Sequence, residues 1–103
     1  MSTLILRRVG MSYIIDGLAD PELDPARLLN ELTARFGPAV VAMTSTEEAD
    51  GSITSLLVDR KAGTWDGIQQ ELVTALRSQG FQYVDWSPSI IEGEQVIRLY
   101  VFR

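Results

Sequence analysis

The sequence predicts an α+β protein, a two-layer sandwich in which two helices lie on one face of an antiparallel sheet. Two segments carry apolar residues at helical spacing, and the segments around them are rich in β-branched and aromatic residues. The second half also partly repeats the first, because a shift of 43 residues aligns Gly37 with Gly80, Val41 with Val84 and Leu56 with Leu99. The 103 residues suit a single domain that spans the whole chain, 1–103.

The chain opens with two apolar runs, 4–9 and 11–15, which are separated by Gly10. Their composition favours strands. They form either a hairpin or one long strand with a glycine bulge.

A helix is predicted over residues 25–36. Asp24 can cap its first turn, and Pro25 suits the first helical position. Apolar residues follow at helical spacing, and Gly37 and Pro38 end the helix. The buried face should contain Leu28, Leu29, Leu32 and Phe36.

A hairpin should follow this helix. Residues 39–46 form its first strand and residues 53–60 return antiparallel to it. Ala49-Asp50-Gly51-Ser52 is typical of a type I′ turn, whose two central residues need positive φ.

A second helix is predicted over residues 65–79. It begins near Thr64 or Asp66, buries Ile68, Leu72 and Leu76, and ends at Gly80. A strand over residues 81–86 follows, and Ser87-Pro88 should break it. The turn at Glu92-Gly93 leads into the final strand.

The predicted order is therefore ββαββαββ. Its inner part, βαββαβ, resembles the ferredoxin-like fold with an extra strand at each end. The resemblance concerns the order of elements only, so it implies no function.

The composition limits the function. The chain has 14 acidic and 9 basic residues, a net charge of −5, whereas a protein that binds nucleic-acid phosphates normally has a basic excess. Histidine and cysteine are absent, which removes the commonest general base, thiol nucleophiles and disulfides. We therefore expect a non-enzymatic protein without a cofactor, located in the cytoplasm and bound neither to nucleic acid nor to a membrane.

One acidic stretch has the spacing of a calcium loop. Asp20, Glu22 and Asp24 occupy positions 1, 3 and 5, and Glu31 occupies position 12. However, the position that needs glycine is Pro25. The same acids suit the start of a helix, which favours negative charge, so we predict no metal site.

The chain ends on the strand Val96-Ile97-Arg98-Leu99-Tyr100-Val101-Phe102-Arg103, which has apolar residues on both faces. Ile97, Leu99 and Val101 should face the helices, so Tyr100 and Phe102 point outward. The preceding strand places Phe81 and Tyr83 on one face and Val84 and Trp86 on the other. An aromatic row of this kind predicts an interface. The alternatives are that the opening hairpin or the loop 87–93 covers it, or that the sheet curls into a half-barrel.

Acidic residues gather in two clusters, which are either solvated loops or a surface that docks on a basic partner. The first cluster contains Asp16, Asp20, Glu22 and Asp24, and the second contains Glu47, Glu48 and Asp50. The predicted partner-binding residues are Tyr83, Tyr100, Phe102, Asp16, Asp20, Glu22, Glu47, Glu48 and Asp50.

Two function classes agree with these features. The first is a small acidic protein-binding module, such as an inhibitor, an immunity-type protein or an adaptor, including phage-type inhibitors whose carboxylates mimic nucleic acid. The second is a homodimeric α+β barrel with a small apolar ligand in a sheet-face pocket lined by Tyr83, Tyr100 and Phe102. The first class requires a protein partner, and the second requires a second copy of the chain.

Overall fold

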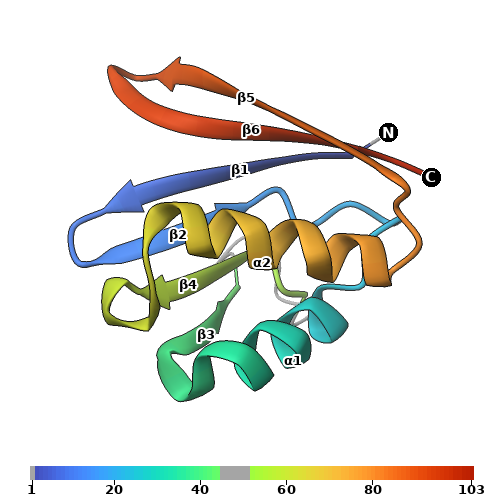
Figure 1. The fold of residues 1–103 in the computed structure, drawn as a ribbon, viewed down its shortest axis with the longest axis horizontal. Coiled ribbons are helices and arrows are strands. Elements are labelled where there is room, and N and C mark those ends of the chain that lie inside the picture. The colour runs from blue at the N-terminus through green and yellow to red at the C-terminus, as the bar shows by residue number, and fades with distance from the viewer. Residues whose placement is uncertain (1, 45–51) are drawn as a thin grey trace.

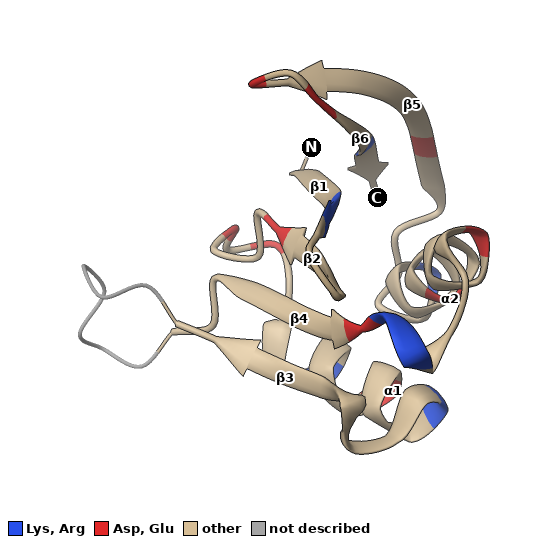
Figure 2. Ribbon diagram, turned by 90° about the vertical axis from the view of Figure 1, so that its left-hand side faces the viewer, with Lys and Arg blue, Asp and Glu red and all other residues tan. Residues whose placement is uncertain are grey.

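The computed structural model describes residues 2–44 and 52–103, which form an α+β fold with two helices and a six-stranded antiparallel sheet. Both helices lie on one side of the sheet (Figures 1 and 2). The elements follow in the order β1 (Ser2–Val9), β2 (Ser12–Asp16), α1 (Pro25–Phe36), β3 (Val40–Met43), β4 (Ser55–Asp59), α2 (Trp65–Ser78), β5 (Tyr83–Ile91) and β6 (Glu94–Phe102). Short 3₁₀ turns, η1 (Gly37–Ala39) and η2 (Arg60–Ala62), follow α1 and β4. No helix in the described ranges is long and apolar enough to span a membrane.

The predicted ferredoxin-like arrangement is not confirmed, because the strand order in the sheet differs from it. The order is β3-β4-β2-β1-β6-β5. In a ferredoxin-like core β2 would have β4 on one side and β5 on the other. Here β1 and β6 lie between β2 and β5. The reason is local, since tight turns keep β1 beside β2 and β6 beside β5, and these partners occupy the edges that β2 and β5 would otherwise share.

The opening segment is a hairpin and not one bulged strand. Val9 pairs with Ser12 across the turn, and Gly10 has a φ of 57°, which suits glycine in a tight turn. This hairpin forms the middle of the sheet, with β4 on one side and β6 on the other. It therefore does not fold over the uncovered face.

Both helices begin at capping residues that the sequence indicates. The Asp24 carboxylate accepts a hydrogen bond from the backbone N–H of Arg27 (3.1 Å), and the Thr64 hydroxyl accepts one from Gly67 N–H (3.1 Å). The helix expected over 25–36 is confirmed, and the second ends one residue before its expected end. The helices bury Leu28, Leu32, Ile68, Leu72, Val73, Ala75 and Leu76. These pack with inward residues of every strand into one core.

The predicted break at Ser87-Pro88 is wrong, because β5 runs from Tyr83 to Ile91 without interruption. Among the described strands its one sheet neighbour is β6, so β5 is an edge strand. At an edge, proline can lack its N–H without loss of a ladder hydrogen bond when that position faces solvent. The strand expected over 39–46 is observed over Val40–Met43, and the turn expected at 49–52 lies largely outside the described residues.

The repeat of 43 residues holds in β4 and β6 but slips by one residue in β3 and β5. Leu56 and Leu99 are both fully buried. Val41, however, is 52% exposed, whereas its counterpart Val84 is 7% exposed. Val40 and Val84 instead occupy equivalent sites, opposite Val58 and Val101. A shift of one residue turns a side chain to the other face of a sheet, so the repeat describes the order of elements better than it describes individual positions.

Candidate functional site

The face of the sheet that points away from the helices, here called the outer face, carries apolar side chains on every strand, with charged residues such as Arg7, Asp16 and Arg98 between them. In the middle of the sheet it presents Ile5, Ile14 and Leu57, which are half-buried by their neighbours. On the β3 side it presents Val41 and Met43, both exposed. The solvated face of an antiparallel sheet normally carries polar side chains, because apolar and polar residues alternate along each strand. Apolar residues on the solvated face of several strands are therefore unusual.

The predicted aromatic residues lie together at the β5–β6 end of the outer face. Tyr83 and Phe102 are direct cross-strand partners, with exposed fractions of 63% and 36%. Tyr100 is half-buried and lies opposite Asp85. Leu99 and Val101 point to the helices and belong to the core. The structure therefore brings Tyr83, Tyr100 and Phe102 to one surface.

The prediction that Phe81 shares a face with Tyr83 is wrong. Phe81 precedes β5 and is fully buried in the core. The guanidinium of Arg103 covers its ring at 4.5 Å and donates hydrogen bonds to the carbonyl oxygens of Gln79 and Glu22. These contacts hold the Arg103 side chain over the Phe81 ring.

The predicted acidic residues are divided among different surroundings. Asp16 lies on the outer face, where it pairs with Arg7 (2.7 Å) and accepts a hydrogen bond from the Ser55 hydroxyl (2.6 Å). Asp20 and Glu22 belong to the segment between β2 and α1, where Asp20 accepts a hydrogen bond from Glu22 N–H (2.8 Å). Glu47, Glu48 and Asp50 lie outside the described residues.

The carboxylates of the calcium-like spacing have other partners. Asp24 caps α1, and Glu31 pairs with Arg27 (3.2 Å) and accepts a hydrogen bond from the Ser78 hydroxyl. Among the residues that the structure describes, no three acidic side chains come together as a metal site.

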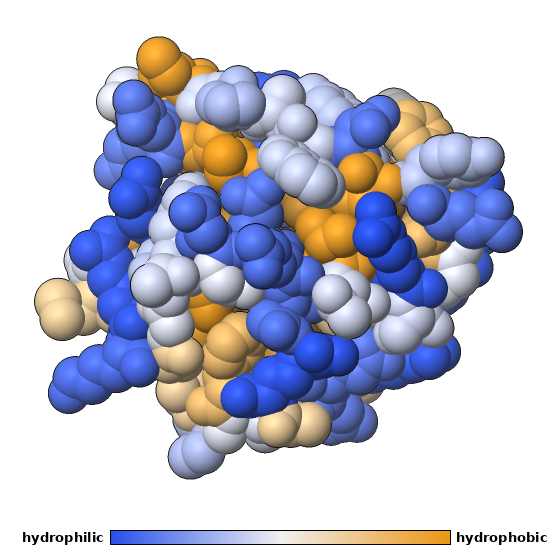
Figure 3. Space-filling model, viewed as in Figure 1, coloured by the Kyte–Doolittle hydropathy of each residue, from blue (hydrophilic) through white to orange (hydrophobic). Residues whose placement is uncertain are grey.

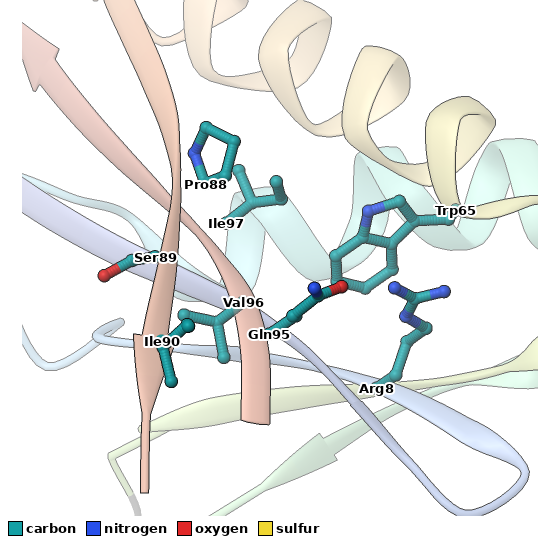
Figure 4. A pocket seen from close by; sticks show the side chains of 8 residues that line it. All are labelled: Arg8, Trp65, Pro88, Ser89, Ile90, Gln95, Val96 and Ile97. Carbon is teal, nitrogen blue, oxygen red and sulfur yellow. The ribbon is translucent and has the colours of Figure 1, made fainter. Parts of the chain in front are cut away.

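The helix side of the sheet contains a cavity of about 450 Å³ that the sequence did not reveal (Figure 4). It lies where the turn end of the β5–β6 hairpin extends past the start of α2 (Figure 1). Hydrophobic side chains also reach the surface over this hairpin (Figure 3). The cavity is lined by Arg8, Trp65, Pro88, Ser89, Ile90, Gln95, Val96 and Ile97.

A stack of basic and aromatic side chains adjoins this cavity. The Arg8 guanidinium lies 4.5 Å from the centre of the Trp65 ring, and Trp65 packs on Tyr13 with ring centres 5.6 Å apart. Arg60 covers the same tyrosine at 5.7 Å. Positions 8, 13, 60 and 65 show no common spacing in the sequence. The one local signal was the row Val84, Trp86, Pro88 and Ile90 on a single face of β5.

Comparison with known proteins gives no significant match: no family model, no curated protein and no solved structure is significantly similar to this chain. The function must therefore be argued from the two surfaces described above.

Proposed function

We propose that this protein is a small non-enzymatic protein-binding module that uses the outer face of its sheet. The observation that supports this most strongly is the aromatic end of the outer face, together with the cross-strand row of Val41, Leu57 and Ile14 on the same face. Exposed apolar surface of this extent usually marks an interaction site. Aromatic residues are also enriched where interfaces gain most of their free energy.

The aromatic end has the properties of an interface anchor. Tyr83 and Phe102 lie side by side on neighbouring strands, and Tyr100 follows on the same face of β6. The sheet ladder holds their backbones in place, so a partner would not need to order them.

The sheet edges support binding through the face and not through strand addition. β3 is only four residues long, and the other edge strand, β5, contains Pro88, which cannot donate a backbone hydrogen bond. Short edges and proline both hinder the pairing of a further strand.

The charges on this face favour a partner with basic groups. Asp85 and Glu94 lie on the outer face, and neither forms an ion pair within the described ranges. The chain as a whole carries a net charge of −5. Opposite charge on a partner would raise the association rate and make it depend on salt. An inhibitor or adaptor of a basic protein, in the cytoplasm, agrees best with these features.

A second candidate is a homodimer in which two outer faces pack together around a small apolar ligand. One observation favours it. Arg98 lies on the same face as Asp85, its Nε is buried without a hydrogen-bond partner, and it forms no ion pair among the described residues. In a twofold dimer the same patch meets itself, so Arg98 of each copy could pair with an acid of the other.

Substitution of Phe102 by alanine tests the main proposal. Phe102→Ala should weaken association with the partner by about 2 kcal/mol, because anchors of this type commonly contribute that much. The isolated chain should keep its unfolding midpoint. Trp86→Ala is the matched control, because Trp86 is similarly exposed (50%) but belongs to the helix-facing row of β5.

The measurements are capture of partners from the native source and the molar mass of the purified chain by light scattering. A captured protein supports the proposal only when Phe102→Ala loses it and Trp86→Ala retains it. A purified chain of twice the monomer mass that Phe102→Ala converts to monomer would support the homodimer. If Phe102→Ala unfolds a monomeric chain without partner, the aromatic row is part of the core and both candidates are wrong.

A further inference from the structure

We propose that the cavity between α2 and the β5–β6 hairpin binds a small organic carboxylate with an aromatic or branched apolar body. Most of its lining lies on the helix side of the sheet, and Ser89 and Val96 contribute from the positions between. The aromatic residues of the outer face, Tyr83, Tyr100 and Phe102, do not line it. The inference therefore goes beyond the proposed function and does not rest on it.

The size and the lining of the cavity suit a small organic molecule. Its volume of about 450 Å³ falls within the range of ligand-binding pockets, roughly 300–1,000 Å³. The Trp65 ring, Ile97 and Pro88 supply apolar surface from three elements, and Figure 4 shows their side chains around one common space. Such a lining favours an apolar body that lies against the indole ring.

Arg8 indicates the charge of the ligand. It is the only charged residue of the lining, it is exposed, and it forms no ion pair in the part of the chain that the structure describes. Its guanidinium lies over the Trp65 ring at 4.5 Å. A guanidinium that stacks on a ring keeps its N–H donors free at its edge, where they match the two oxygens of a carboxylate.

The neighbouring groups do not oppose an anion. The acid nearest in sequence on β6, Glu94, pairs with Ile91 on the outer face, whereas Gln95 pairs with Ile90 and lines the cavity. The Gln95 amide is neutral and offers donors as well as an acceptor. In Figure 4 its side chain extends toward the Trp65 ring.

The position of Trp65 is fixed before any ligand arrives. Its ring packs on Tyr13, which is buried and donates a hydrogen bond from its hydroxyl to the carbonyl oxygen of Gly63 (3.1 Å). The guanidinium of Arg60 also lies over the Tyr13 ring. A preformed site loses little conformational entropy when a ligand binds, so little of the binding free energy is spent on ordering the site.

The test uses 4-phenylbutyrate as the probe and 4-phenylbutan-1-ol, which lacks the carboxylate, as its neutral match. In a Trp86→Phe background Trp65 is the single tryptophan, because the chain has two, and Trp86 does not line this cavity. The acid should change Trp65 fluorescence saturably and bind at least about tenfold more tightly than the alcohol, the factor expected for a hydrogen-bonded charge pair. A lack of saturation, or equal affinity for both probes, would overturn the proposal.

Two charge variants and one apolar variant locate the site. Arg8→Gln should weaken binding of the acid about tenfold and leave binding of the alcohol unchanged. Arg77→Gln removes the same charge from an exposed position of α2 outside the cavity and should change neither affinity. Ile90 is 71% exposed, so Ile90→Ser should fold normally and weaken both probes.

Two results of this series would contradict the site. If Arg77→Gln weakens the acid as much as Arg8→Gln does, the effect is one of overall charge and not of this cavity. A peptide that ends in phenylalanine serves as a third probe. If this peptide binds and 4-phenylbutyrate does not, the cavity accepts the carboxyl end of a polypeptide, and the proposal of a small-molecule site is wrong.

Discussion

The unit α1-β3-β4 and the unit α2-β5-β6 follow the same plan, but their strands differ in length. At about 1.5 Å per helical residue and about 3.4 Å per strand residue, α1 is ~18 Å long and β4 is ~17 Å long. In the second unit α2 is ~21 Å long, whereas β6 is ~31 Å long. Their residue counts are 12 and 5 in the first unit and 14 and 9 in the second.

This difference in length decides which unit has a cavity on the helix side of the sheet. The helix of the first unit is long enough to cover its strand. In the second unit the hairpin extends beyond its helix, so the cavity beside Trp65 forms on the helix side. The same long strands carry Tyr83, Tyr100 and Phe102 on the other side. The cavity and the aromatic end of the outer face therefore belong to the second unit, whereas Val41, Met43 and Leu57 of the outer face belong to the first.

The largest expected effect tests the register slip between β3 and β5. Val84→Asp should destabilise the protein by about 4 kcal/mol or more, because it places an unpaired charge in the core. Val41→Asp, at the position that the 43-residue repeat aligns with it, should change the free energy of unfolding by about 0.5 kcal/mol or less, since Val41 is exposed. Urea unfolding at neutral pH measures both. Similar losses for the two variants would show that the units share one register.

The next effect tests where the units are alike. Leu56→Ala and Leu99→Ala each remove a fully buried side chain and should each cost about 3 kcal/mol. Leu57→Ala is the control, because Leu57 is half-buried on the outer face. It should cost clearly less than Leu56→Ala in the same urea titration. A loss below about 1 kcal/mol at Leu99 would mean that the second unit packs loosely on its helix.

The smallest effect compares the starts of the two helices. Asp24→Ala and Thr64→Ala each remove a side-chain acceptor of one backbone N–H and should each lower stability by about 1 kcal/mol. Asp24→Asn and Thr64→Ser keep the acceptor and should restore most of the loss. Addition of calcium should leave the melting temperature of the wild-type chain unchanged. A rise in melting temperature with calcium would show that the folded chain binds calcium, and the prediction of no metal site would then be wrong.

The sequence by itself determined the local features of this protein. The helix start at Asp24 and the end of α1 at Gly37 depend on groups within a few residues of one another, and so does the start of α2 at Thr64, one of the two starts that the sequence offered. The alternation in β6 likewise predicted that Leu99 and Val101 face the core while Tyr100 points away. These features can be predicted from the sequence because each one depends on interactions between residues that are close together in the chain.

Only the tertiary structure decided the strand order, the register of β5 and the cavity. Strand pairs join residues far apart in the sequence, and a single cross-strand pair contributes only about 0.2–1 kcal/mol, so many pairings have similar free energies until the whole core forms. The assembled sheet placed β1 and β6 between β2 and β5 and kept Pro88 at an edge. It also brought Arg8 over Trp65, across 57 positions of the sequence, because β1 and the start of α2 meet only when the helices pack on the sheet.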